Sequence, residues 1–209
     1  MPFRSLCLAL LLVLVSSARA DWEAVFNAQS SRGSFPRAAG KFYSKIDRFR
    51  VDTNVPVEMS LYVKSGSSRV EAAIPSFRMR LTSDLEKFSA QVPACLSRSF
   101  EDCVKRFGLK KTGEAACGEG GDPRTCEIFS GDGKGLKDVK KIEIRHWKGE
   151  KEPILASSVV TKKDGDVITT TFAKISRKSH DEAFYAVPAG YVNAGSLDKF
   201  LGDFKGGSE

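Results

Sequence analysis

The chain has 209 residues, with 33 Lys or Arg against 26 Asp or Glu and a formal net charge of +7 at pH 7. Hydrophobic residues make up 41% of the sequence, which excludes an intrinsically disordered chain and allows one domain with a substantial core. Acidic residues are interspersed with the basic ones, and this mixture argues against a nucleic-acid-binding protein.

The first twenty residues have the pattern of a secretory signal peptide. Arg4 supplies a positive start, an apolar run follows over residues 6–15, and residues 18–20 form a small-x-small cleavage site. The apolar run is too short to span a bilayer, and no Cys follows it as a lipoprotein anchor would require. We therefore expect a signal peptide at 1–20, a single domain at 21–209, and a periplasmic or secreted location without a membrane anchor.

Four cysteines follow the signal segment: Cys95, Cys103, Cys117 and Cys126. An even number of closely spaced cysteines in an exported protein is typical of disulfides. Their spacing lacks the short gap between zinc ligands, and no His is near in sequence, so no metal site is expected. Of the three possible pairings, the local one is favoured, with Cys95 joined to Cys103 and Cys117 joined to Cys126 across the loop at 118–124.

The N-terminal part of the domain begins with a predicted helix and then changes to strands. Residues 21–30 are predicted to form a short helix, because three apolar residues fall on one side. A loop follows at 31–40. Residues 41–51 are strand-like, but Ile46 and Phe49 break the alternation, which indicates a bulge.

Apolar and polar residues then alternate along three short segments. The apolar members are Val57, Met59, Leu61 and Val63, then Val70, Ala72 and Ile74, then Phe77, Met79 and Leu81. A period of two predicts strands with one buried face. The turns between them are short, so the strands are predicted to pair antiparallel, because parallel pairing needs long crossovers.

The C-terminal part contains one interior helix and a further series of strands. The helix is predicted at 99–108, where Gly108 is suited to a left-handed cap. Strands are predicted at 109–117, 125–130, 140–148, 154–161 and 167–175, and a last helix at 197–204. The fold class is therefore mainly β (α+β), with nine or ten strands in one curved antiparallel sheet and two or three short helices.

No motif in the sequence specifies a catalytic site. His146 is expected in a strand and His180 in a turn, and neither belongs to a recognisable nucleophile motif. The glycine-rich run at 131–135 lacks the spacing of a phosphate-binding loop and is predicted to be a hairpin turn. We therefore expect a non-enzymatic protein without a cofactor, and an enzymatic role is only a third hypothesis.

The apolar face and the basic residues each allow two interpretations. The apolar face could be an ordinary core beneath a helix, or it could line a cavity that a curved sheet with few helices leaves unfilled. Arg48, Arg50, Arg78 and Arg80 are expected to share an outward strand face. Such a face is either solvated or directed at an anionic lipid surface.

Several short motifs occur in a characteristic order between residues 40 and 193. They are Leu61-Tyr62-Val63-Lys64-Ser65-Gly66, Arg69-Val70-Glu71, Phe77-Arg78-Met79, Cys126-Glu127-Ile128-Phe129, Pro153-Ile154-Leu155 and the closing segment from Ala183 to Tyr191. In this order the chain resembles uncharacterised bacterial periplasmic proteins related to the LolA- and LppX-like lipoprotein carriers. The closing segment is the most specific motif. There Phe184 is expected to plug the core, Pro188 to stop strand pairing and Gly190 to permit a turn.

The resemblance implies an unclosed antiparallel half-barrel that binds acyl chains or other hydrophobic cargo between its concave face and the helices. The sequence departs from the family in its cysteine-containing region and in the glycine-rich loop after Cys117. The cargo-handling arginine of the carriers has no identifiable counterpart here. The resemblance therefore supports the fold more strongly than it supports the function.

Our first hypothesis is a non-enzymatic periplasmic protein that binds a lipid, an acyl chain or another hydrophobic small molecule in the half-barrel cavity, with a carrier role as one form of it. The residues expected to line this cavity are Val57, Met59, Leu61, Val63, Val70, Ile74, Phe77, Met79 and Leu81. The alternative is an envelope-associated protein-interaction module with a filled core. An envelope protein or a membrane surface is then the partner, and no nucleic acid is expected.

Overall fold

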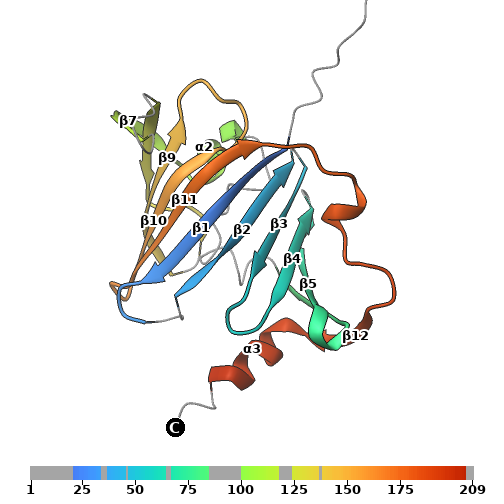
Figure 1. Cartoon of the computed structure of the whole chain (residues 1–209). Coiled ribbons are helices and arrows are strands. Elements are labelled where there is room, and N and C mark those ends of the chain that lie inside the picture. The colour runs from blue at the N-terminus through green and yellow to red at the C-terminus, as the bar shows by residue number, and fades with distance from the viewer. Residues whose placement is uncertain are drawn as a thin grey trace, which may run out of the picture.

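The computed structural model describes residues 21–33, 37–45, 47–64, 67–84, 100–117, 124–136 and 138–205. These residues form one sheet of 12 strands with two α-helices (Figure 1). The predicted signal peptide and Cys95 lie outside the described residues.

Two meanders of antiparallel strands make up most of the sheet. The first consists of β1 (Trp22–Ser30), β2 (Ala38–Lys45), β3 (Arg48–Thr53), β4 (Met59–Lys64), β5 (Arg69–Ile74) and β6 (Met79–Asp84). The second consists of β7 (Lys110–Ala116), β8 (Thr125–Gly131), β9 (Val139–Trp147), β10 (Leu155–Lys162) and β11 (Val167–Arg177). Pairing of β1 with β11 joins the two meanders. The short β12 (Val192–Ser196) is added parallel to β6 at one edge.

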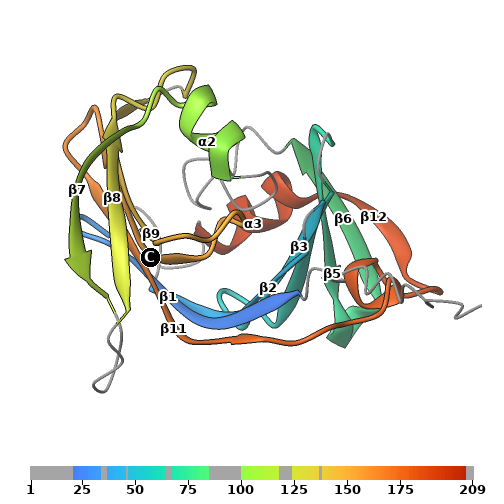
Figure 2. The same cartoon turned by 90° about the horizontal axis from the view of Figure 1, so that it is seen from above.

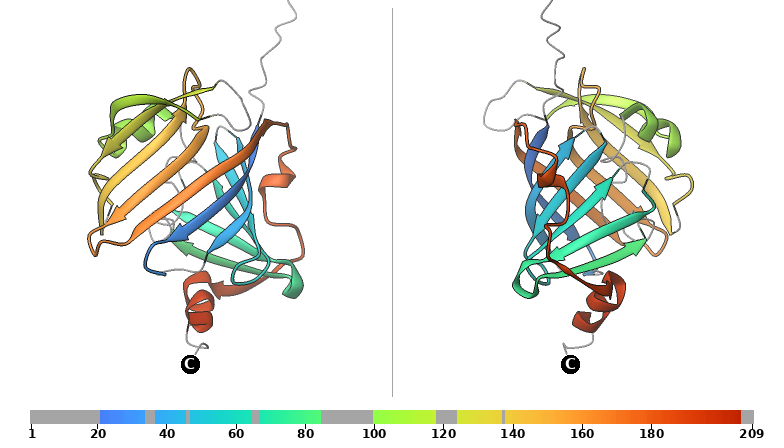
Figure 3. Two further views of the ribbon diagram at one scale, coloured as in Figure 1. Left: turned by 60° about the vertical axis from the view of Figure 1, so that its left-hand side comes forward. Right: turned by 90° about the vertical axis from the view of Figure 1, so that its right-hand side faces the viewer.

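The sheet curves strongly and does not close. Its two edges are β12 and β7, which lie on opposite sides of the opening when the molecule is seen from above (Figure 2). Helix α2 (Phe100–Arg106) lies on the concave side, and α3 (Leu197–Lys205) lies at one end of the curved sheet (Figures 2 and 3). The predicted unclosed half-barrel is confirmed. Both helices are much too short to cross a bilayer, and the described part of the chain has no longer apolar helix.

The hydrophobic core lies on the concave face. Inward side chains at every second strand position pack with residues of both helices, including Phe100 of α2 and Leu197 of α3. The centre of this core is aromatic: the ring centroid of Phe42 lies 4.9 Å from that of Trp22 and 5.7 Å from that of Phe172. Offset and edge-to-face contacts of this kind add stability beyond the area that they bury.

The convex face is covered along β1–β4 by the chain between β11 and β12, here called the outer segment (residues 178–191; Figure 3). Asp21 holds it, because its carboxylate accepts hydrogen bonds from the backbone N–H of His180 and the hydroxyl of Tyr185, both at 2.9 Å. Asp21 is only 3% exposed. Burial and this hydrogen bond raise the pKa of Tyr185, so its hydroxyl remains a donor.

Aromatic rings and the guanidinium of Arg50 complete the contact between the outer segment and the sheet. Phe184 packs edge-to-face on Tyr43, at 4.8 Å between centroids, and lies under the guanidinium of Arg50 at 4.4 Å. Arg50 also donates a hydrogen bond to the carbonyl of Phe184. Phe184 therefore covers the convex face, and the expectation that it plugs the core is wrong. It lies in a 3₁₀ turn, Ala183–Tyr185, and not at the end of a strand.

The helix predicted at 21–30 is wrong, because these residues form β1. Its inward positions are Trp22, Ala24, Phe26 and Ala28, all buried. Two of the four are Ala, a residue of weak strand preference, so the period of two is hard to see in the sequence. The bulge predicted in 41–51 is also wrong. The break in alternation there comes from a tight turn between β2 and β3.

Two other differences lie near β6. Phe77 was expected to continue a strand, but it ends a 3₁₀ turn (Pro75–Phe77) and is 63% exposed. The strand β12 was not predicted, and its parallel pairing with β6 departs from a purely antiparallel sheet. Its residues, Val192–Ser196, are all exposed, and apart from Val192 they are small or polar, so they carry no hydrophobic pattern.

The helices predicted at 99–108 and 197–204 and the second disulfide agree with the structure. Gly108 follows α2 with φ of +62°, and Ser196 accepts a hydrogen bond from the backbone of Lys199 at the start of α3. Cys117 and Cys126 are joined, with 5.7 Å between their Cα atoms. Cys103 is disulfide-bonded, and Cys95, its predicted partner, lies outside the described residues.

We expect Tyr62→Lys to lower the free energy of unfolding by about 3 kcal/mol, because it buries an ammonium group under the outer segment. Tyr62 is 5% exposed, and the guanidinium of Arg50 already lies 5.5 Å from its ring centroid. Urea denaturation measures the effect. Tyr62→Phe is the control and should lose about 1 kcal/mol or less. Equal stabilities of Tyr62→Lys and the parent protein would contradict the buried position.

Replacing both Cys117 and Cys126 with Ser should lower the free energy of unfolding by about 2–3 kcal/mol, because the disulfide closes a short loop. Peptide mapping without reduction should recover Cys117 linked to Cys126, as in the structure. The same map tests the predicted Cys95–Cys103 bond. Free thiols in the exported protein, or bound zinc, would contradict both assignments.

Candidate ligand-binding site

Most of the nine predicted cavity residues share the concave face. Six of them are buried in the hydrophobic core: Met59, Leu61, Val63, Val70, Ile74 and Leu81. Val57 and Met79 are half-buried at the margin of the same core. Phe77 is separate and exposed. The residues that alternate in the sequence thus lie on one apolar face of adjacent strands. That face is buried in the hydrophobic core.

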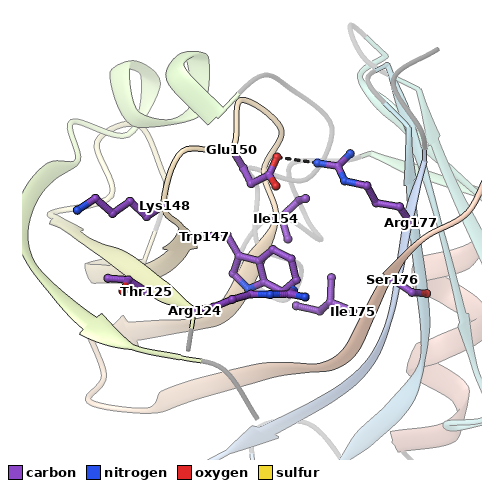
Figure 4. A pocket seen from close by; sticks show the side chains of 9 residues that line it. All are labelled: Arg124, Thr125, Trp147, Lys148, Glu150, Ile154, Ile175, Ser176 and Arg177. Carbon is purple, nitrogen blue, oxygen red and sulfur yellow. Dashed lines mark hydrogen bonds and ion pairs between the residues drawn. The ribbon is translucent and has the colours of Figure 1, made fainter. Parts of the chain in front are cut away.

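A pocket of about 640 Å³ lies elsewhere, at the end of the sheet where β9 connects to β10. Its lining comes from the start of β8, the end of β9, the β9–β10 connection and the end of β11: Arg124, Thr125, Trp147, Lys148, Glu150, Ile154, Ile175, Ser176 and Arg177 (Figure 4). None of the nine predicted residues is among them. Sequence reasoning missed this pocket because its lining is gathered from three separate segments of the chain, at 124–125, 147–154 and 175–177.

The pairing of the strands explains why a pocket forms here. β10 and β11 are paired only from Ser157–Thr171 to Thr161–Val167. Beyond that point β10 stays with β9, where Leu155 pairs with His146, while β11 stays with β1, where Arg177 pairs with Trp22. The sheet therefore divides between β10 and β11. A bulge lies on each branch, between Leu155 and Ser157 and opposite Glu23–Val25.

The floor of the pocket is apolar and continuous with the core. Ile154 is fully buried and belongs to the same hydrophobic cluster as Met59 and Leu61. Trp147 and Ile175 are partly buried and pack against that cluster. Figure 4 shows these three side chains in the middle of the pocket. An apolar group bound there would extend the existing core.

Charged groups surround this floor. The guanidinium of Arg124 lies over the ring of Trp147, 3.8 Å from its centroid. Arg177 reaches across to the β9–β10 connection, where it forms ion pairs with Glu150 at 2.6 Å and Glu152 at 3.0 Å. Figure 4 shows Glu150 and Arg177 facing each other across the pocket. Lys148 is paired with Glu114 of β7.

His146 precedes Trp147 of the pocket lining, is buried and packs against helix α2. Its ring stacks on Phe100 of α2, with centroids 3.6 Å apart, and Nε2 lies 2.7 Å from the carbonyl of Glu152. A carbonyl only accepts, so Nε2 carries the hydrogen and Nδ1 is an acceptor. Burial lowers the pKa of His146. His180 instead stacks on Phe184 in the outer segment.

Three buried polar atoms on the concave side lack a hydrogen-bond partner among the described residues. They are Nε1 of Trp22, Oγ of Ser83 and Nδ1 of His146. Ser83 shares the face of Val70, its cross-strand partner, and His146 faces α2. A few such atoms are usual in a folded protein, so these three are compatible with an ordinary core. Among the described residues, no group of His, Cys, Asp or Glu could hold a metal ion.

Comparison with known proteins finds similarity in structure only. An uncharacterized conserved protein from Thermus thermophilus has a TM-score of 0.55 at 14% identity, with 84% of this chain and 90% of that chain covered. A LolA superfamily protein from Nitrosomonas europaea has a TM-score of 0.44 at 9% identity, covering 80% and 89%. The lipoprotein LppX from Mycobacterium tuberculosis has a TM-score of 0.38 at 8% identity, covering 76% and 88%. No family model and no curated protein matches the sequence. The likeness to the Thermus thermophilus protein is one of fold.

The stability of the protein should depend on His146 below pH 6.5. A neutral His is favoured in the folded state because burial lowers its pKa from 6.5, so protonation favours unfolding. The contribution is complete above pH 6.5 and is lost as the pH falls below it, by up to about 1.4 kcal/mol per pH unit. Urea denaturation at pH 7.5 and 5.5 should show a larger decrease for the parent protein than for His146→Phe. Equal decreases would contradict a buried neutral His146.

Proposed function

We propose that this protein is a non-enzymatic binding protein for a lipid, an acyl chain or another hydrophobic ligand, and that the ligand occupies the half-barrel. The observation that carries the proposal is the pocket at the division between β10 and β11, whose apolar floor continues into the core of the concave face. A volume of about 640 Å³ is within the range of small-molecule binding sites.

Eight of the nine residues predicted from the sequence belong to this proposal as the deeper part of the site. Six of them form the concave core that Ile154 joins to the pocket. Exposed Phe77 has no place in this path.

The site of action in this proposal is the periplasm or the outside of the cell. It rests on the signal-peptide pattern of residues 1–20. The disulfide between Cys117 and Cys126 is in keeping with an oxidising compartment.

An envelope-associated interaction module is the second candidate, and the burial of the concave face favours it. The predicted cavity residues of β4 and β5 are 8% exposed or less, as in a filled core. The basic strand face is a weak partner surface, however, because three of its arginines are engaged. Arg48 pairs with Asp47 and Glu182, Arg50 with Asp52, and Arg80 with Glu71.

Native mass spectrometry and solvent extraction of the purified protein distinguish the two candidates. A hydrophobic molecule should accompany the protein, or the protein should take up a fluorescent fatty acid. A protein that carries no such molecule and takes up no fatty acid would overturn the first candidate. Crosslinking in cells to one stable protein partner would then favour the second.

Ile175→Glu should reduce fatty-acid uptake by about tenfold or more, because it replaces part of the apolar floor with a carboxylate. Ile175 is only partly buried and close to Arg177 in the pocket, so the fold should persist. Phe77→Ser is the matched control, since it removes an exposed apolar side chain outside the pocket. Fluorescence titration and thermal melting of both variants give the result. Equal loss of uptake in both would contradict a site at the pocket.

A further inference from the structure

We propose that one corner of the sheet edge docks on an anionic lipid bilayer, with Phe77 and Val192 inserted among the lipids and Arg78 in contact with their headgroups. This corner, here called the edge corner, consists of the 3₁₀ turn Pro75–Phe77, Arg78 and the first residue of β12, Val192. None of these residues lines the pocket, so the inference does not depend on the proposed function.

The edge corner contains both of the large hydrophobic side chains that are exposed in the described part of the chain. Phe77 is 63% exposed and Val192 is 69% exposed. They are far apart in the sequence, and the pairing of β12 with β6 brings them to the same edge of the sheet. Single exposed apolar residues are common on protein surfaces, whereas exposed apolar residues gathered at one place indicate an interaction site.

Backbone hydrogen bonds fix the shape of the edge corner. The N–H of Val192 donates to the carbonyl of Arg78 at 2.9 Å, and the N–H of Arg78 donates to the carbonyl of Pro75 at 3.1 Å. Arg78 has a φ of +48°, in the left-handed region that a residue with a side chain rarely adopts. Figure 1 shows this turn, in green, next to β12. The chain therefore holds Phe77 outside the core while β6 and β12 continue in the sheet.

Arg78 supplies the charge that a negative surface requires. Its side chain is exposed and, among the described residues, forms no ion pair. The other three arginines of the predicted basic face are each paired with a carboxylate. An exposed cation next to apolar side chains matches the negative headgroups and the hydrocarbon beneath them. The net charge of +7 adds a long-range attraction to the same surface.

The size of the edge corner favours a bilayer over a protein partner. A stable protein interface buries about 800 Å² on each partner and has several large side chains at its centre. The edge corner provides two apolar side chains and one cation. A bilayer requires no matching surface, and its interface accepts single apolar side chains. Docking on it should be weak and reversible.

Flotation of the full protein with lipid vesicles tests the inference. Vesicles of phosphatidylcholine and phosphatidylglycerol in equal parts should bind the protein at least about fivefold more tightly than vesicles of phosphatidylcholine alone, as expected for one basic residue near an anionic surface. This preference should disappear in 1 M salt, where charges are screened beyond about 3 Å. Equal binding to both kinds of vesicle in low salt, or binding to neither, would overturn the inference.

Variants of the edge corner test its residues. Phe77→Ser should weaken binding to the mixed vesicles by about tenfold, because it removes the larger apolar side chain, and Phe77→Leu should restore most of the binding. Arg78→Gln should weaken binding by about fivefold, whereas Arg78→Lys keeps the charge and should bind as the parent protein does.

Lys140→Gln is the matched control for the charge, because Lys140 is an exposed cation on β9, and five strands of the sheet separate β9 from β6. Thermal melting checks that each variant is folded. Unchanged binding of folded Phe77→Ser, or equal losses in Arg78→Gln and Lys140→Gln, would overturn the assignment of the edge corner.

A photo-crosslinking amino acid at position 77 identifies the occupant in cells. Crosslinks to lipid should predominate. Crosslinks to one protein, together with no binding to vesicles, would overturn the bilayer as the occupant. Fatty-acid uptake from solution uses no vesicles and should be the same in Phe77→Ser and the parent protein. The failure of this inference is therefore distinguishable from the failure of the proposed function.

Discussion

The pairing of β1 with β11 is the constraint on which the rest of the structure depends. It joins a meander formed by residues 22–84 to one formed by residues 110–177, which otherwise would each end in an unpaired strand at the centre of the molecule. Side chains from both sides of this junction form the aromatic centre of the core, in which Phe42 lies within 6 Å of both Trp22 and Phe172. One continuous concave face, and hence one core, follows from this single pairing.

The same pairing produces the pocket. β11 continues beside β1 as far as Arg177, and β10 turns away with β9, so two strands that are neighbours at Val167 are no longer paired beyond Thr171. Lys174 has φ of +51° in this part of β11, close to the register shift opposite β1. Bulges bend strands and increase their twist. The bulges on these two branches therefore let β10 and β11 separate at one end of the sheet. Ile154, Ile175 and Arg177 border the resulting division.

Sequence periodicity predicted the parts of the fold in which large apolar side chains alternate. Met59, Leu61 and Val63 show why: a large side chain at every second position identifies the buried face directly. β1 was missed because Ala24 and Ala28 occupy two of its inward positions. β12 was missed because its pairing with β6 depends on backbone hydrogen bonds and leaves every side chain exposed.

The outer face shows a second limit of the same reasoning. The sequence placed Arg50 on an outward strand face, and it lies there, but gave no sign that Phe184 of the outer segment packs on its guanidinium. A sequence pattern describes only one strand and its two faces. The cover on the convex face comes from the outer segment, which lies more than 100 positions away in the sequence and is hydrogen-bonded to Asp21. The pocket has the same origin, since Arg124 and Arg177 meet there only through the tertiary fold.

These features together explain why a ligand would be bound at the divided end of the sheet. The convex face is covered by the outer segment, which Asp21, Arg50 and Tyr185 fix in place. The concave face is occupied by a buried core beneath α2 and α3. Where β10 and β11 separate, the core reaches the surface through the partly buried Trp147 and Ile175, next to the fully buried Ile154. The proposed ligand could make apolar contacts there without unfolding either face, because the division of the sheet leaves the edge of the core accessible.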